Sequence, residues 1–480
     1  MSATTSIDTA EADRLIGTAW PDDLVPRLQE YIAIPALSPA FDADWAANGH
    51  LTRAVDLVED WMRSRPIEGM RVWRQELEGR TPLLVASIDA FGLADPTGPA
   101  TVLYGHLDKQ PEMVGWRDDL GPWIPVLEGT RLYGRGGADD GYAAFASLTA
   151  IEAVQRTGGS HPPLMVLIEA SEESGSPDLP AHVDALAADP DGGLGDVDLV
   201  VCLDSGCATY DTLWLTTSLR GLVGGQLQVD IVTEGLHSGG AGGVVASSFR
   251  IVRMLLDRIE RAVDGAVLLD SANVEIPGHR IAEAAATANL LGDGVYEAAP
   301  LVPGARPMVE DHLEALLART WRPSLSYTGA DGMPATGSAG NVLRPSTTLS
   351  LSMRIPPTAD PVAVERELTD VLEADPPYGA LVEFRGEGAA GWNAPELAPW
   401  LGDTLDAASR DVFGQPMQLM GEGGTIPFMG MLGDRFPEAQ FVITGVLGPG
   451  SNAHGPNEFL DVAYAEKLTR ILARVLDRGA

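Results

Sequence analysis

Four short apolar runs in the sequence each end at, or lead directly into, histidine or carboxylate side chains. The runs span residues 100–105, 163–170, 198–204 and 440–448, and the side chains that close or follow them are His106, Asp108, Glu172, Glu173, Asp204 and His454. Imidazole nitrogens and carboxylate oxygens are ligands that zinc and related divalent cations accept. The pattern therefore predicts a metal site assembled from separate segments of the chain.

A further acidic pair, Asp139 and Asp140, lies in the stretch GRGGADDG, directly before a predicted helix. Two cations about 3.5 to 4 Å apart need a bridging carboxylate and terminal ligands on each side. Two histidines with three or four carboxylates supply that number. The adjacent pair Glu172 and Glu173 fits the same scheme, because one carboxylate can bind a metal while its neighbour stays free to act as a base.

Each of these motifs alone carries little weight, because a chain with 68 acidic residues contains HxD and EE pairs by chance. A lone histidine is more often a surface or capping residue than a ligand. The prediction rests on the conjunction of the motifs in one order, each at the end of a predicted strand. Cys202 and Cys207 have no further Cys or His neighbours that would complete a zinc site, so we expect them to be buried packing residues. The glycine clusters GRGGADDG and GEGGTIPFMG do not have the spacing of a dinucleotide-binding motif, and no GxSxG nucleophile motif is present.

The apolar runs alternate with helical stretches, which indicates an α/β fold with a mostly parallel sheet flanked by helices. Binding sites in such sheets form at the carboxyl ends of the strands, where the predicted ligands fall. From 217 to 391 the strands instead alternate apolar and polar residues, as in an antiparallel sheet with helices on one face. We therefore expect a catalytic domain at 1–216 plus 392–480 and an inserted α+β, ferredoxin-like domain at 217–391.

Helical periodicity marks several segments, and a further helix is predicted within 391–413. Helices are predicted at 22–34, 48–64, 142–156, 243–262, 307–319, 361–374 and 463–478, and a long loop is predicted at 292–307.

The formal net charge of −36, from 32 basic and 68 acidic residues, argues against nucleic acid and anionic membranes as partners. Two cysteines in 480 residues exclude a disulfide framework and favour a reducing compartment. No stretch reaches the ~18 apolar residues of a membrane-spanning helix, and the acidic N-terminal residues carry no secretory signal. We expect a cytoplasmic protein.

The order of the motifs GHLD, GRGxxDD, EASEESG, LD, LHSG and AHGPNE resembles the di-zinc exopeptidase family. That family includes carnosinase-like dipeptidases, carboxypeptidase G, aminoacylases and succinyl-diaminopimelate desuccinylase, and the resemblance is greatest to the dipeptidase branch. It extends from about residue 20 to residue 478. It implies two divalent metal ions per subunit, zinc or alternatively manganese or cobalt. The implied ligands are His106 and Asp204 on one metal, Glu173 and His454 on the other, and Asp139 as the bridge.

The resemblance also implies roles in catalysis. Glu172 is the expected general base, and Asp108 is expected to orient His106. In the family the inserted domain is a lid that also forms the homodimer, and His237 in LHSG matches a lid histidine that reaches the partner subunit's site and polarises the scissile carbonyl. Arg354 matches a lid arginine that binds the substrate carboxylate, with a strand-face salt bridge as the alternative.

Three more residues, Asn341, Gly424 and Thr425, fall where dipeptidase-like members contact substrate. One departure from the family pattern is visible, because the family motif reads DDKG whereas Gly141 and Tyr142 follow the acidic pair here. The missing lysine is not a metal ligand, so the metal site is expected to persist with altered packing or substrate preference beside it.

The predicted reaction is metal-dependent hydrolysis of the amide bond of dipeptides or short peptides with a free C-terminal carboxylate. The nucleophile would be a metal-bridging water that Glu172 activates. Deacylation of N-acyl amino acids, or desuccinylation, by the same metal site is the alternative. A non-catalytic dimeric binding module is a rival from another class; loss of Glu172 or of a ligand would indicate it, and neither is lost.

Overall fold

The chain forms two compact units in the computed structural model, which describes residues 6–93, 96–189, 193–296, 299, 301–424 and 426–479. The core unit consists of Met1–Thr216, Ala394–Leu419 and Met431–Ala480, and the inserted unit consists of Thr217–Asn393 and Met420–Gly430. Met420–Gly430 therefore groups with the inserted unit, whereas the sequence analysis places all of 392–480 in the catalytic domain. The reason is non-local pairing, because β18 (Gln418–Glu422) adds to the small sheet β17-β8-β18.

The core unit is built on a six-stranded sheet in the order β1-β2-β6-β3-β7-β19. The strands are β1 (Met70–Gln75), β2 (Leu83–Ile88), β3 (Ala100–His106), β6 (Leu164–Glu169), β7 (Val197–Cys202) and β19 (Gln440–Ile443). β6, β3, β7 and β19 run parallel, and β2 pairs antiparallel with both β6 and β1. The expected mostly parallel sheet is confirmed. Its central strands are continuous apolar runs because they are buried on both faces.

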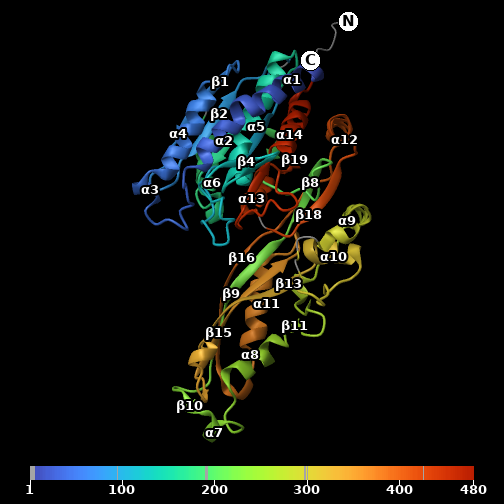
Figure 1. Ribbon diagram of the computed structural model, residues 1–480. Coiled ribbons are helices and arrows are strands. Elements are labelled where there is room, and N and C mark those ends of the chain that lie inside the picture. The colour runs from blue at the N-terminus through green and yellow to red at the C-terminus, as the bar shows by residue number, and fades with distance from the viewer. Residues whose placement is uncertain are drawn as a thin grey trace. The chain divides into compact units, whose positions relative to one another are not determined.

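Helices cover this sheet and pack on one another (Figure 1). α5 (Tyr142–Arg156) contacts β3 and β6, and α14 (Val462–Leu476) and α1 (Thr9–Ala19) pack against α5. The other helices of the unit are a π-helical turn (Trp20–Leu24), α2 (Val25–Ile32), α3 (Trp45–Asn48), α4 (His50–Arg63), α6 (Leu179–Ala188), α12 (Pro399–Phe413) and part of α13 (Pro427–Arg435). A second small sheet contains β4 (Val126–Glu128), β5 (Arg131–Tyr133) and β20 (Phe459–Asp461).

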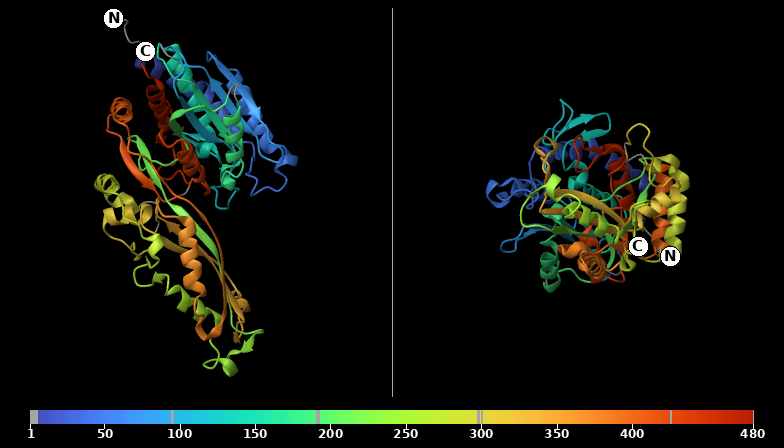
Figure 2. Two further views of the ribbon diagram at one scale, coloured as in Figure 1. Left: turned by 180° about the vertical axis from the view of Figure 1, so that it is seen from behind. Right: turned by 90° about the horizontal axis from the view of Figure 1, so that it is seen from below.

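The inserted unit contains a four-stranded antiparallel sheet in the order β13-β15-β9-β16. Its strands are β9 (Gly221–Asp230), β13 (Ser324–Asp331), β15 (Ser346–Ile355) and β16 (Leu381–Ala389). Burial alternates strictly along β15, and α8 (Ser248–Leu256) and α11 (Pro361–Glu373) pack on the buried face. Figure 2, left, shows α11 lying along the strands of this sheet. The predicted antiparallel sheet with helices on one face is confirmed.

The shorter elements of this unit are β8 (Trp214–Leu219), which enters it from the core unit, and β10 (Leu236–His237), α7 (Ser238–Ala241), β11 (Glu260–Arg261), β12 (Ala266–Val267), α10 (His312–Thr320), β14 (Val342–Leu343) and β17 (Trp392–Asn393). A helix that the sequence analysis missed, α9 (Gly278–Leu291), packs against α10. Ala284, Ala288 and Leu291 of α9 pack with Leu313 and Leu316 of α10, so the apolar stripe of α9 is present but consists largely of alanine. Among the described helices, none is both long enough and apolar enough to span a bilayer.

Candidate metal centre

The parallel strands of the core sheet deliver the predicted metal ligands to one edge. His106 is the last residue of β3, and Glu172 and Glu173 lie in a 3₁₀ turn just after β6. Asp204 follows the end of β7 by two residues. Because β6, β3 and β7 are adjacent and parallel, their carboxyl ends meet, which is where α/β sheets place their sites.

Asp139 lies at the centre of this group. Its Oδ1 is 3.3 Å from His106 Nε2, and its Oδ2 is 3.0 Å from His454 Nε2. His106 Nε2 also lies 3.7 Å from Asp204 Oδ2, and His454 Nε2 lies 3.3 Å from Glu173 Oε2. The structure thus brings all five predicted ligands together.

These five residues form two groups that share Asp139. We name His106, Asp139 and Asp204 the His106 half-site, and Asp139, Glu173 and His454 the His454 half-site; within each, the potential ligand atoms lie within 4.8 Å of one another. The half-sites differ in burial, because the His106 side chain is 0% exposed and the His454 side chain is 54% exposed. His454 also lies in a loop, with a positive φ of 63°.

Asp108 makes contacts with both the His106 imidazole and the turn that carries Glu172. The imidazole of His106 is held through Nδ1 by the backbone carbonyl of Asp108, at 3.1 Å, whereas the nearer carboxylate oxygen of Asp108 is 3.6 Å away. That carboxylate accepts the backbone N–H groups of Glu172 at 3.0 Å and Glu173 at 2.9 Å. Asp108 therefore links the segment that carries His106 to the turn that carries the expected base.

The electrostatics of the centre are those of enclosed carboxylates crowded together. Burial raises the pKa of Asp204 to about 6, with His106 opposing the rise and Asp139 adding to it. Burial and the charge of Asp204 hold the pKa of Glu172 well above its usual range, and burial together with Asp139 does the same for Glu173. Each of these three groups resists ionisation because burial and the neighbouring carboxylates disfavour its charged form. Burial opposes ionisation of Asp139 too, but its hydrogen bonds with His106 and His454 hold its pKa below the usual range.

The donor set fits two divalent cations. Imidazoles and carboxylates are the only side chains in the two half-sites, and a carboxylate shared between two ligand groups is the arrangement that paired metals need. Bound cations would also reverse the electrostatic argument, because they are the largest local charges and favour the ionised carboxylates.

A buried ion pair that the sequence analysis did not identify fastens the loop of His454. Arg135 Nη1 donates to Glu458 Oε2, and both side chains are almost completely buried. Arg135 Nη2 also donates to the Gly455 carbonyl at 2.9 Å, and Glu458 accepts the Gly136 N–H at 2.9 Å. The pair joins the segment before Asp139 to the loop after His454. The available signal was that Arg135 lies in the GRGxxDD motif and Glu458 ends AHGPNE.

The expected lid and substrate residues lie in the inserted unit. His237 is exposed at the end of β10, and the Ser238 N–H donates to the Asn341 carbonyl at 2.9 Å, so His237 and Asn341 lie on neighbouring segments. Arg354 is partly buried on β15. Gly424 is exposed, and Thr425 lies outside the described residues.

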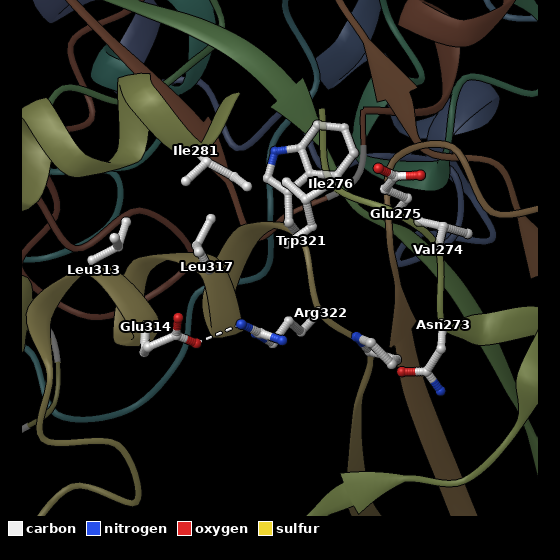
Figure 3. Close-up of a pocket in the computed structure, with 11 residues that line it drawn as sticks. Asn273, Val274, Glu275, Ile276, Ile281, Leu313, Glu314, Leu317, Trp321 and Arg322 are labelled. Atoms are coloured by element: carbon white, nitrogen blue, oxygen red, sulfur yellow. Dashed lines mark hydrogen bonds and ion pairs between the residues drawn. The ribbon is translucent and has the colours of Figure 1, made fainter. Parts of the chain in front are cut away.

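A separate pocket of about 420 Å³ lies in the inserted unit between α9, α10 and the segment at 273–276. Figure 3 shows Ile281, Leu317 and Trp321 on its apolar side, and the ion pair between Glu314 and Arg322, 2.5 Å long, at its edge. None of the five candidate metal ligands lines it, so it is distinct from the metal centre.

The chain is similar in sequence and in fold to known dipeptidases. It is 28% identical over 405 residues to a cysteinylglycine-S-conjugate dipeptidase of Corynebacterium striatum, covering 81% of this chain and 83% of that protein. It is 26% identical to a Cys-Gly metallodipeptidase of Schizosaccharomyces pombe, covering 92% of each. The solved structure of a dipeptidase from Saccharomyces cerevisiae superposes with a TM-score of 0.75 at 21% identity, covering 98% of both chains, which shows a shared fold.

The family match covers most of the sequence. Residues 102–478, which include every candidate metal ligand and all of the inserted unit, match Peptidase family M20/M25/M40. The chain belongs to this family of peptidases.

Proposed function

We propose that the chain is a metal-dependent dipeptidase that hydrolyses the amide bond of dipeptides or short peptides with a free C-terminal carboxylate. The observation that carries the proposal is the pair of ligand groups sharing Asp139, with Glu172 directly beside the ligand Glu173. Membership of the peptidase family supports hydrolysis, and the named dipeptidase relatives support a short substrate.

In the proposed centre, His106 and Asp204 would hold one cation, Glu173 and His454 would hold the other, and Asp139 would be shared between them. Such cations lower the pKa of a coordinated water and polarise the scissile carbonyl. We propose zinc, because its preference for imidazole and carboxylate ligands matches the donor set; manganese and cobalt accept the same ligands.

Glu172 is proposed as the general base. Its backbone N–H is held by the Asp108 carboxylate, and it lies in the turn just after β6, the strand next to the one that ends at His106. A carboxylate in that position can accept the proton of the attacking water and return it to the leaving amine. Holding the backbone of Glu172 reduces the reorganisation needed to reach that geometry.

Arg354 is the proposed recognition group for the substrate's C-terminal carboxylate, because a guanidinium binds a carboxylate through two parallel hydrogen bonds. Asn341, Gly424 and Thr425 are proposed as further substrate contacts, and His237 as the group that stabilises the oxyanion in the partner subunit. This last role requires a homodimer.

A cytoplasmic location is also proposed. Cys202 and Cys207 are both free and buried, which is compatible with a reducing compartment.

The test is a panel of dipeptides and N-acyl amino acids, incubated with the zinc-loaded protein and with protein stripped by a chelator. We expect dipeptides to be cleaved, activity to disappear on stripping, and activity to return when Zn²⁺ is added back. Cleavage of N-acyl amino acids alone would overturn the dipeptidase proposal in favour of a deacylase. Activity that survives complete removal of metal would overturn the metal mechanism.

A further inference from the structure

One of the two lysines in the chain, Lys109, lies wholly inside the core unit beside the metal centre. It follows Asp108 directly and is completely buried. The proposed mechanism gives it no role, and burying a charged side chain is costly unless it is well paired. Its contacts therefore need an explanation.

The ammonium group of Lys109 closes the end of α2. Its Nζ donates to the carbonyls of Tyr31 and Ile34, both at 2.8 Å, and lies 3.4 Å from the carbonyl of Ile32. It also lies 3.9 Å from the centre of the Tyr31 ring. The last carbonyls of a helix have no partner within the helix and attract cations, so Lys109 is a C-terminal cap supplied from another segment.

The stem of Lys109 lies against the glycine-rich loop that leads to Asp139. A Cβ at Gly136 would lie 2.6 to 2.9 Å from three carbons of the Lys109 stem, so this position has no room for a side chain. Glycine is also required at the other end of the loop, because a Cβ at Gly141 would lie 2.2 Å from the Tyr31 ring. The ring thus occupies the space that the missing lysine of the DDKG motif would need.

Lys109 is also joined directly to the ligand His106. The carbonyl that accepts from His106 Nδ1 belongs to the peptide unit between Asp108 and Lys109. Anchoring the Lys109 side chain fixes the plane of that peptide, and the orientation of the imidazole follows. A hydrogen bond of this kind is how outer groups tune a metal ligand.

We propose that Lys109 is a positioning residue for the metal centre, setting His106 and Asp139 at the separation that two cations require by clamping both segments to the end of α2. The proposal rests on the metal centre assigned under the proposed function. The proposal adds that Lys109 takes the place of the lysine that is missing after Asp140. Its Nζ lies over the Tyr31 ring, and that ring fills the space beside Gly141.

The first test uses the unaltered protein. Because the chain has two lysines, protein labelled with ¹³Cε-lysine gives two resonances, and Lys467→Met assigns them. During titration with Zn²⁺ we expect the Lys109 resonance to shift, with an end point at two equivalents, while that of Lys467 stays in place. Zinc binding that moves neither resonance would overturn the role of Lys109. If the unaltered protein binds no zinc at all, the proposed function itself fails.

The second test measures zinc affinity by competition with a chelator in Lys109→Met, Lys109→Gln and Lys467→Met. Lys467 lies on α14 with its Nζ 4.9 Å from the Phe413 ring, so it is the matched control. We expect Lys109→Met to weaken zinc binding about 10-fold or more, as for other outer groups. Lys109→Gln, which keeps two N–H donors, should recover part of the loss. Unchanged affinity in folded Lys109→Met would contradict the proposal; should that variant not fold, the Lys109→Gln affinity and the resonance titration decide.

Discussion

The two half-sites of the metal centre share Asp139 yet are built in different ways. His106 is the last residue of a central strand, is fully buried and is oriented by a backbone carbonyl. His454 has a half-exposed side chain and lies on a loop whose position is held by the ion pair of Arg135 and Glu458. The sheet itself positions one half-site, whereas the other must be fastened to it. We therefore expect the His106 half-site to bind its cation more tightly.

The largest effect on metal binding and turnover should come from replacing Asp139, the residue that the two half-sites share. Asp139→Ala should release both cations and reduce turnover by about 1,000-fold or more, because about 4 kcal/mol of transition-state stabilisation is lost with the metals. Metal content by mass spectrometry and dipeptide turnover check this. A variant that keeps one tightly bound cation would show that the half-sites are independent.

The next effect concerns the fastening of the His454 loop. Glu458→Gln leaves the Arg135 guanidinium buried without its counter-charge, so the free energy of unfolding should fall by about 3 kcal/mol. The weaker cation should be lost preferentially. Denaturant unfolding and zinc titration measure the two effects.

Glu11→Gln is the control for this variant, because it breaks an exposed pair with Arg14 on α1. Its effect on the free energy of unfolding should be small, because solvent screens an exposed ion pair. Equal destabilisation by the two variants would contradict a special role for the buried pair.

Replacing the two histidines one at a time sharpens the comparison. Each of His106→Ala and His454→Ala should leave one cation per chain. In metal-free protein, His106→Ala should cost about 2 kcal/mol because it leaves buried polar groups without a partner. His454→Ala removes a half-exposed side chain, so it should cost less than His106→Ala. Equal thermal unfolding midpoints for the two stripped variants would refute the comparison.

The smallest expected effect is a pH dependence of stability that comes from His182, a histidine outside the metal centre. His182 is buried, its Nε2 donates to the Thr81 carbonyl at 2.8 Å, and burial holds its pKa below the usual value. The folded state then binds fewer protons than the unfolded state, so stability is lost as the pH falls below about 6.5.

The contribution of His182 to the slope of the free energy of unfolding against pH should not exceed about 1.4 kcal/mol per pH unit, which is the value for one proton. Unfolding of metal-free wild type and His182→Gln between pH 5 and 8 measures it. The variant should have the flatter profile, and a steeper one would reverse the assigned sign.

The sheet and the position of the candidate ligands at its strand ends were predictable from local sequence patterns, whereas the division of the ligands into two half-sites was implied by the family resemblance. Continuous apolar runs indicate buried parallel strands, and residues just after such strands meet at one edge, which is why His106, Glu173 and Asp204 could be grouped. The alternation of apolar residues along β15 identified the second kind of sheet. The periodicity of apolar residues therefore indicates which strands are buried on both faces and which on one.

The contacts between distant segments could not be predicted in this way. The pairing of Arg135 with Glu458 spans 323 positions, and nothing near Lys109 in sequence indicates that it caps α2. The carboxylate of Asp108 binds backbone N–H groups, which have no sequence signature. α9 was missed although Ala284, Ala288 and Leu291 recur at helical spacing, because alanines mark only a weakly apolar face. Tertiary packing decides all of these features.

The most direct test of the account is Glu172→Gln, with metal content and dipeptide turnover measured on the same sample. Glu172 is assigned to proton transfer and not to metal binding, so the variant should keep two cations per chain. Turnover should fall by about 100- to 10,000-fold, the usual contribution of a general base. Full turnover in a variant that retains both cations would contradict the proposed mechanism, and loss of a cation would show that Glu172 is a ligand.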